Sequence, residues 1–61
     1  MKAVVLERPD GTRFVGLYQS EDAAKDGRPP SYKILAIRNV TYETVDAVRN
    51  SLECEFDCWK P

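Results

Sequence analysis

Residues 2–18 read KAVVLERPDGTRFVGLY, and this stretch decides the fold because two apolar runs flank a turn sequence. Val, Leu, Phe and Tyr favour extended strands, whereas Pro, Asp and Gly favour a reversal of the chain. Pro9 presets the first corner of a type I turn, Asp10 suits the second corner, and Gly11 adopts the left-handed conformation that closes the turn with a bulge. We therefore predict an N-terminal β-hairpin over residues 2–18.

Two further elements are predicted next along the chain. A capping serine, acidic residues and a terminal glycine at 20–27 predict a short helix near 20–26. The following segment holds the continuous apolar run 34–37, which is typical of a strand with apolar side chains on both faces. We predict a strand over 32–40 and place it inside the sheet.

The last third of the chain has two periodicities. Thr41 suits the N-cap position, and apolar residues follow at helical spacing from Val45 to Leu52, which predicts the main helix over 41–51. Beyond it, apolar and acidic residues alternate, which is the period of a half-buried strand. Each acidic residue would cost about 0.3–1 kcal/mol at the C-terminal end of a helix, so we favour a fourth strand over 52–59 to a longer helix.

These elements predict one α+β domain over residues 1–61. It is a small, mostly antiparallel sheet of three or four strands, with the main helix packed on one face and the opposite face left open. A chain of 61 residues buries only about 60% of the surface that its unfolded form exposes, so its stability is marginal. An open apolar face on a marginal domain favours association, and we predict a homodimer.

The composition indicates a cytoplasmic protein. The hydrophobic fraction of 43% and the charged fraction of 31% are typical of a globular chain, and no apolar run is long enough for a signal peptide or a membrane span. Cys54 and Cys58 are the only cysteines and histidine is absent, which leaves too few ligands for a structural zinc site. Their spacing suits neither a disulfide within a strand nor a redox pair, so we expect two buried, reduced thiols.

Catalytic residues are scarce in this sequence. General acid–base catalysis at neutral pH most often uses histidine, and the chain has none. Gly11, Gly16 and Gly27 are too widely spaced for a phosphate-binding loop. We therefore predict a non-enzymatic binding or regulatory protein that needs no metal and no cofactor. The enzyme alternative is an active site assembled between subunits from tyrosines, arginines and carboxylates.

Aromatic and acidic residues are the candidates for contacting a partner. Interfaces favour Tyr and Trp as anchors, and the alternation at the C-terminal end places acidic side chains on the solvent side of the predicted strand. The predicted partner-binding residues are Tyr18, Tyr32, Glu53, Glu55, Phe56, Asp57 and Trp59. We expect them to engage another protein through the exposed sheet face and edge.

Nucleic-acid binding is the rival function. Arg8 and Arg13 flank the hairpin tip, and Arg28 follows the short helix. Residues 1–40 carry seven basic and five acidic side chains, and residues 41–61 carry two and five, so the two segments have net charges of +2 and −3. A surface that follows a phosphate backbone usually has a stronger basic excess, and for that reason we favour protein binding.

Overall fold

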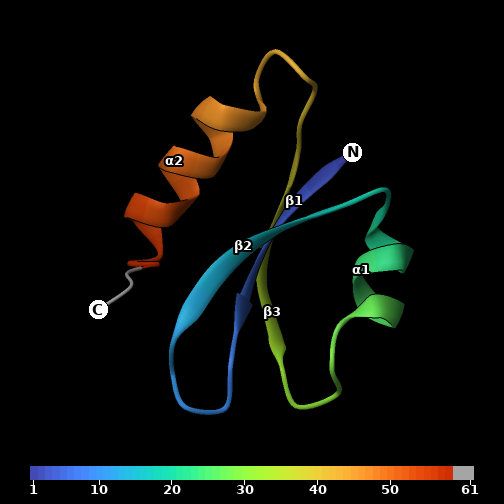
Figure 1. The fold of residues 1–61 in the computed structure, drawn as a ribbon, viewed down its shortest axis with the longest axis vertical. Helices are drawn as coiled ribbons and strands as arrows, with labels where there is room; N and C mark the ends of the chain where they lie inside the picture. Colours follow the sequence, from blue (N-terminus) through green and yellow to red (C-terminus); the bar gives the residue numbers. More distant parts are fainter. Residues whose placement is uncertain (59–61) are drawn as a thin grey trace.

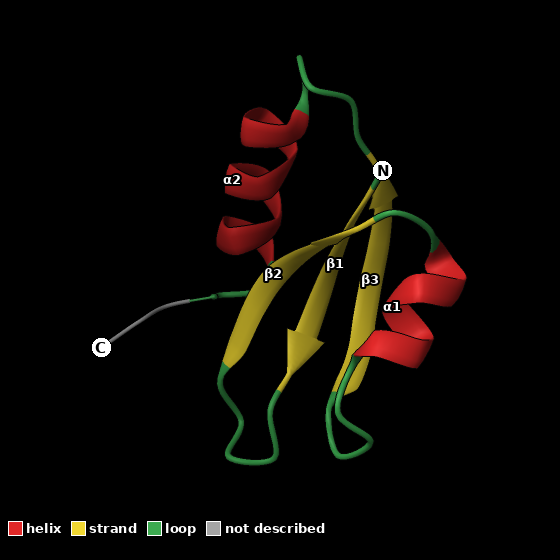
Figure 2. Cartoon of the chain, turned by 45° about the vertical axis from the view of Figure 1, so that its right-hand side comes forward, coloured by secondary structure: helices red, strands yellow, loops and turns green. Residues whose placement is uncertain are grey.

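The computed structural model describes residues 1–58 of the chain, which form a three-stranded antiparallel sheet and two helices (Figure 1). The elements are β1 (Lys2–Glu7), β2 (Arg13–Tyr18), α1 (Glu21–Gly27), β3 (Lys33–Asn39) and α2 (Val45–Glu55). The strand order is β2-β1-β3 (Figure 2). This arrangement confirms the predicted α+β class, with three strands.

The N-terminal hairpin forms as predicted. Gly11 has a φ of 93°, and its backbone N–H donates to the carbonyl of Arg8 at 2.9 Å. The carboxylate of Asp10 accepts from the backbone N–H of Thr12 at 2.9 Å and from its hydroxyl at 2.7 Å. The turn is therefore held by the conformational freedom of glycine and by an aspartate that bonds the backbone two residues on.

The central strand is β1, and the placement of residues 32–40 inside the sheet was wrong. β1 pairs antiparallel with β2 on one side and with β3 on the other. Four consecutive β1 side chains, from Ala3 to Leu6, are fully buried, whereas the apolar side chains of β3 are half-buried. The apolar runs of the two strands look alike in sequence, but the β1 run is covered on both faces and along both edges.

The two helices cover opposite faces of the sheet (Figures 1 and 2). On one face Ala3 and Val5 pack with Leu52 of α2. On the other face Val4 and Leu6 pack with Ala24 of α1. The face that we expected to be open is therefore covered by the short helix, together with half-buried side chains of β2, β3 and the segment before β3.

The short helix α1 begins as its sequence predicts. The Ser20 hydroxyl accepts from the backbone N–H of Ala23 at 3.1 Å, which satisfies one of the unpaired donors of the first turn. At the other end, the N–H of Arg28 donates to the carbonyl of Ala24 at 3.2 Å. Within residues 1–58, neither helix has the length and apolar character that crossing a membrane requires.

The main helix lies four residues later than the predicted 41–51. Thr44, rather than Thr41, is the N-cap residue, and its side chain makes no cap bond to the helix. Thr41 instead closes the preceding turn, because its carbonyl accepts from the N–H groups of Thr44 and Val45 at 3.1 and 2.9 Å. The side chain of Thr44 accepts from the Thr41 N–H at 2.9 Å, so this turn uses the threonines that a cap would have used.

The fourth strand predicted over 52–59 was wrong, because α2 continues to Glu55 and residues 56–58 close it; residue 59 lies outside the described residues. Burial decides the outcome: Leu52 is 2% exposed, and burying such a side chain stabilises by about 1.5–3 kcal/mol. Val45 and Val48 pack against the same core, and together with Leu52 they outweigh the cost of the acidic residues near the helix C-terminus. The Arg13 guanidinium also donates to the carbonyl of Phe56 at 3.0 Å, which places a positive charge at this end of α2.

Candidate functional site

The outer side of β2 presents unpaired backbone groups in a regular row. Arg8 N–H donates to the Thr12 carbonyl at 2.8 Å, which makes these residues a hydrogen-bonded pair of the hairpin. Such pairs alternate along an antiparallel ladder, so the register of β1 with β2 fixes which residues of β2 face β1. Those facing β1 are Phe14, Gly16 and Tyr18. Those facing outward are Arg13, Val15 and Leu17, and we call their backbone groups the β2 edge.

The β2 edge lacks the usual protection of an edge strand. Residues 14–18 carry no charged side chain, and β2 pairs with β1 in unbroken register. Arg13 is the one charged residue of the strand, and it contacts Glu7 at 3.2 Å and the carbonyl of Phe56 at 3.0 Å. Within residues 1–58 no strand pairs with this side of β2. An edge that has no charge over residues 14–18 and no bulge is a template for pairing with another chain.

The outer side of β3 is protected by contrast. Its register with β1 shifts between Val5 and Leu6, so β3 bulges at this point. The exposed Lys33 and Arg38 lie near its two ends. Bulges and charged side chains are the two commonest devices that prevent edge-to-edge pairing. The sheet therefore has one edge that is protected against pairing with another chain and one that is not.

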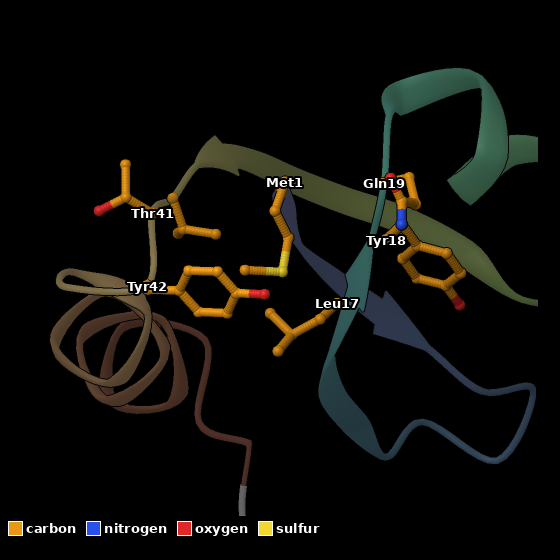
Figure 3. A pocket seen from close by; sticks show the side chains of 7 residues that line it. Met1, Leu17, Tyr18, Gln19, Thr41 and Tyr42 are labelled. Atoms are coloured by element: carbon orange, nitrogen blue, oxygen red, sulfur yellow. The ribbon is translucent and has the colours of Figure 1, made fainter.

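A pocket of about 410 Å³ adjoins the C-terminal end of β2 (Figure 3), and we call it the apolar pocket after the exposed Met1, Leu17 and Tyr42 side chains that line it. Its lining residues are Met1, Leu17, Tyr18, Gln19, Val40, Thr41 and Tyr42. The side chains of Met1, Leu17 and Tyr42 point toward one another, whereas the ring of Tyr18 points away from them. These three are the large hydrophobic residues that the described chain exposes, at 44%, 38% and 92% respectively. Their convergence gathers the exposed large hydrophobic side chains of residues 1–58 at one place.

The aromatic residues predicted to bind a partner do not form one surface. Tyr18 and Tyr32 pack half-buried on the α1 side of the sheet, where Tyr32 meets Phe14 edge-to-face with ring centroids 5.9 Å apart. Phe56 is half-buried against the core on the α2 side. Trp59 lies outside the described residues. Tyr18, Tyr32 and Phe56 therefore help to cover the core, and Tyr18 also borders the apolar pocket.

The acidic residues do not form the ridge that a strand would have produced. Glu53 and Glu55 lie on α2, where successive positions are about 100° apart, so they point in different directions. Glu53 is half-buried and Glu55 is exposed. Asp57 follows the helix in the left-handed conformation, with a φ of 56°. The alternation of charge in this segment therefore creates no common acidic face.

Only one of the two cysteines is buried. Cys58 is 7% exposed and packs in the core beside α2, as expected, whereas Cys54 is exposed on the helix surface. The expectation that both were buried failed because it assumed a strand, in which they would share one face. Among the described residues, no three Cys, Asp or Glu side chains gather closely enough to hold a metal ion.

The arginines proposed for nucleic-acid binding each contact their own chain. The Arg8 guanidinium lies 4.3 Å from the centroid of the Phe14 ring and donates to the Thr12 hydroxyl at 3.1 Å. Arg28 donates to the carbonyl of Tyr32 at 2.8 Å. Arg13 is held by Glu7 and by the end of α2. These contacts orient the three guanidinium groups along their own backbone.

Sequence reasoning missed the apolar pocket. Leu17 is the one residue that the strand pattern could have indicated, because it is exposed between the half-buried Gly16 and Tyr18. Met1 and Tyr42 join it only through the turn that brings residues 40–42 beside the start of β1. The contact is fixed by the bond from the Val40 N–H to the Met1 carbonyl at 3.0 Å. No family model, curated protein or solved structure matches this chain.

Proposed function

We propose that the chain is a non-enzymatic protein-binding domain that receives an extended segment of another polypeptide along the β2 edge. The observation that carries the proposal is an unbulged edge, uncharged over residues 14–18, that leads directly into the apolar pocket. Strand addition supplies affinity through backbone hydrogen bonds and specificity through side-chain pockets. The β2 edge offers the first and the apolar pocket offers the second.

The bound segment would pair with three residues of the edge. Arg13, Val15 and Leu17 each present one N–H and one carbonyl, and each bond is worth about 0.5–1.5 kcal/mol net. Association costs about 4–15 kcal/mol of lost freedom, so backbone bonds alone give little affinity. A buried aliphatic or aromatic side chain adds about 1.5–3 kcal/mol. The ligand should therefore carry such a side chain beside Met1, Leu17 and Tyr42.

The rival functions receive less support from the geometry. A phosphate backbone would need guanidinium groups that project into solvent, but Arg8, Arg13 and Arg28 make intramolecular contacts. The enzyme alternative needs a pocket in which titratable groups converge. The apolar pocket is lined by no Asp, Glu, Lys or Arg side chain, and in a second pocket beside α1 the lining Glu21 and Lys25 pair with each other at 3.3 Å.

Photo-crosslinking at the pocket tests the proposed function. Tyr42→p-benzoylphenylalanine keeps an aromatic ring at a position that is 92% exposed, and it labels whatever occupies the pocket. We expect protein adducts that disappear when Leu17→Pro is added, because this change removes an outward N–H and the Leu17 side chain together. Mass spectrometry should place the adduct in an apolar, extended segment.

The matched control is Asn39→Pro, which puts the same residue at the end of the protected edge strand β3. It should leave the adducts in place. Adducts that persist with Leu17→Pro, or that consist of RNA or DNA, contradict protein binding through the β2 edge. Circular dichroism of each variant establishes that the sheet is intact.

A further inference from the structure

We infer that the polypeptide that binds the β2 edge is β2 of a second copy of this chain, which joins two sheets into one of six strands. This inference rests on the proposed function and names the partner of the same site. It follows from the residue pattern on either side of Gly16. Two copies of one strand pair antiparallel about a twofold axis, so the strand must be complementary to its own reverse.

An axis at Gly16 gives the register with the best side-chain pairs. Each Val15 then lies opposite Leu17 of the second copy, and each Phe14 lies opposite Tyr18 of the second copy. Aromatic pairs and aliphatic pairs across strands are stabilising. Val15 and Leu17 both belong to the β2 edge, so their pairing also uses the outward backbone groups of both chains.

The neighbouring registers are poorer. An axis at Val15 places Arg13 opposite Leu17 of the second copy, so a guanidinium faces an apolar side chain. An axis at Leu17 places Val15 opposite Gln19 of the second copy. In that register Phe14 has no partner of similar size. At the Gly16 axis, Arg13 lies opposite Gln19, whose amide oxygen accepts hydrogen bonds. A single register is therefore favoured by both packing and polarity.

Gly16 is suited to the axis by its surroundings. A Cβ atom built at this position lies 3.0 Å from Cε1 of Tyr18, so the tyrosine ring occupies the space beside Gly16 on the α1 side of the sheet. The two glycines would meet at a non-hydrogen-bonded pair, where the strands approach most closely. The flanking Phe14 and Tyr18 rings of both copies then cover the junction.

The pairing also joins the two apolar pockets. Leu17 of each copy lies diagonally across from Leu17 of the other, on the face that carries α2. The surface formed by Met1, Leu17 and Tyr42 thus continues into its counterpart. A standard interface buries about 800 Å² per partner, or about a fifth of the 4237 Å² surface of this chain. A domain of 61 residues buries little apolar surface on its own, and dimerisation would add buried apolar surface and therefore stability.

Two measurements on the unmodified chain test the inference. Light scattering over a concentration series should give twice the monomer mass of 6.9 kDa. In a mixture of isotope-labelled and unlabelled chains, filtered NMR spectra should show contacts between the methyl groups of Val15 and Leu17 of different copies. Val15–Val15 contacts or Leu17–Leu17 contacts in the absence of any contact between Val15 and Leu17 would indicate another register and contradict the Gly16 axis.

A matched pair of variants tests the edge itself. Leu17→Lys places a charge in the junction and should weaken the dimer about tenfold or more, since it removes two buried leucines from the assembly. Asn39→Lys places the same charge at the end of the other edge strand, β3, and should leave the dimer unchanged. Leu17→Thr is a second variant that should fold normally, because threonine favours strands. It should weaken the dimer less than Leu17→Lys does.

The outcomes separate this inference from the proposed function. A chain that stays monomeric at millimolar concentration, but whose Tyr42 crosslinks depend on Leu17, binds a different protein at the β2 edge, and the inference of a second copy is then wrong. A dimer that persists in Leu17→Lys uses another surface, and this result would also contradict the inference of a second copy at the β2 edge. Crosslinks that ignore Leu17→Pro contradict the proposed function itself.

Discussion

The two edge strands of this sheet pair with the same central strand, but they differ in how their outer edges are protected against pairing with another chain. β3 has a bulge where its register shifts, and exposed basic residues lie near both of its ends. β2 has an unbroken register and five uncharged residues in succession. Natural edge strands are normally protected against pairing with other chains, so protection on one side only is informative. The difference is the basis of our proposal that another polypeptide pairs with β2.

The largest expected effect comes from placing proline at adjacent positions of β2. Gly16→Pro removes an N–H that faces β1 and brings ring atoms against Tyr18, whose Cε1 lies 3.0 Å from a Cβ at this position. We expect it to lower the free energy of unfolding by about 3 kcal/mol or more. Leu17→Pro removes an outward N–H and should cost the isolated chain less than about half of that.

Urea unfolding of both variants at low protein concentration measures this difference. Equal losses at the two positions would show that the backbone of β2 does not alternate as the hairpin register requires. The comparison of the edges would then lose its basis, because the outward row of donors and acceptors would not exist.

Arg13 is expected to have the next largest effect. Its guanidinium joins β2 to the C-terminal end of α2 through the carbonyl of Phe56 and pairs with Glu7. We expect Arg13→Ala to destabilise the fold by about 1–2 kcal/mol, since a cation at a helix C-terminus and a charged hydrogen bond are both lost. Arg13→Lys should recover part of the loss. Thermal unfolding of the two variants checks the order.

Removing the charged side chains that protect the edge of β3 should change association more than it changes the stability of the fold. The double variant Lys33→Thr and Arg38→Thr takes two exposed charges from the edge and supplies residues that favour strands. We expect a stability change within about 1 kcal/mol and the appearance of assemblies larger than a dimer. Analytical ultracentrifugation detects them. If the double variant associates no more than the unmodified chain, the bulge alone protects this edge.

The smallest expected effect concerns the turn that begins β2. Hydrogen bonds from the backbone N–H and then the hydroxyl of Thr12 hold the pKa of Asp10 below its ordinary value of 3.8. The ionised carboxylate therefore stabilises the fold at a pH above 3.8, and this contribution declines as the pH falls through the lower folded pKa. Asp10→Asn should flatten that part of the pH dependence. Urea unfolding over the acidic range measures it, and an unchanged slope would contradict the role of Asp10.

The local elements could be predicted from the sequence because neighbouring residues determine them. The turn at Pro9, Asp10 and Gly11 carries its own conformational signals, and the hairpin formed as expected. The Ser20 cap also depends on residues three positions apart. In both cases the interacting groups lie within a few residues of one another in the chain.

The errors arose where distant residues decide the structure. Residues 52–55 alternate like a strand, but Leu52 continues the stripe by which α2 packs on the sheet, and Arg13 compensates the helix end from a distant strand. The central place of β1 likewise depends on pairing with β3. For the candidate site, the sequence pointed to an exposed edge, but the residues predicted to bind a partner do not share one surface in the fold. Leu17 and Tyr42 meet only through the fold.

The central position of the first strand has a consequence for how the chain is made. During synthesis β1 and β2 emerge together, and a hairpin closes within about 1–10 μs. The opposite side of β1 acquires its neighbour only when residues 33–39 leave the ribosome, because β3 comes after α1. Until then, the side of β1 that faces β3 in the finished fold has no strand beside it. The nascent chain is therefore most prone to aggregate at β1, which is the best protected strand of the folded protein.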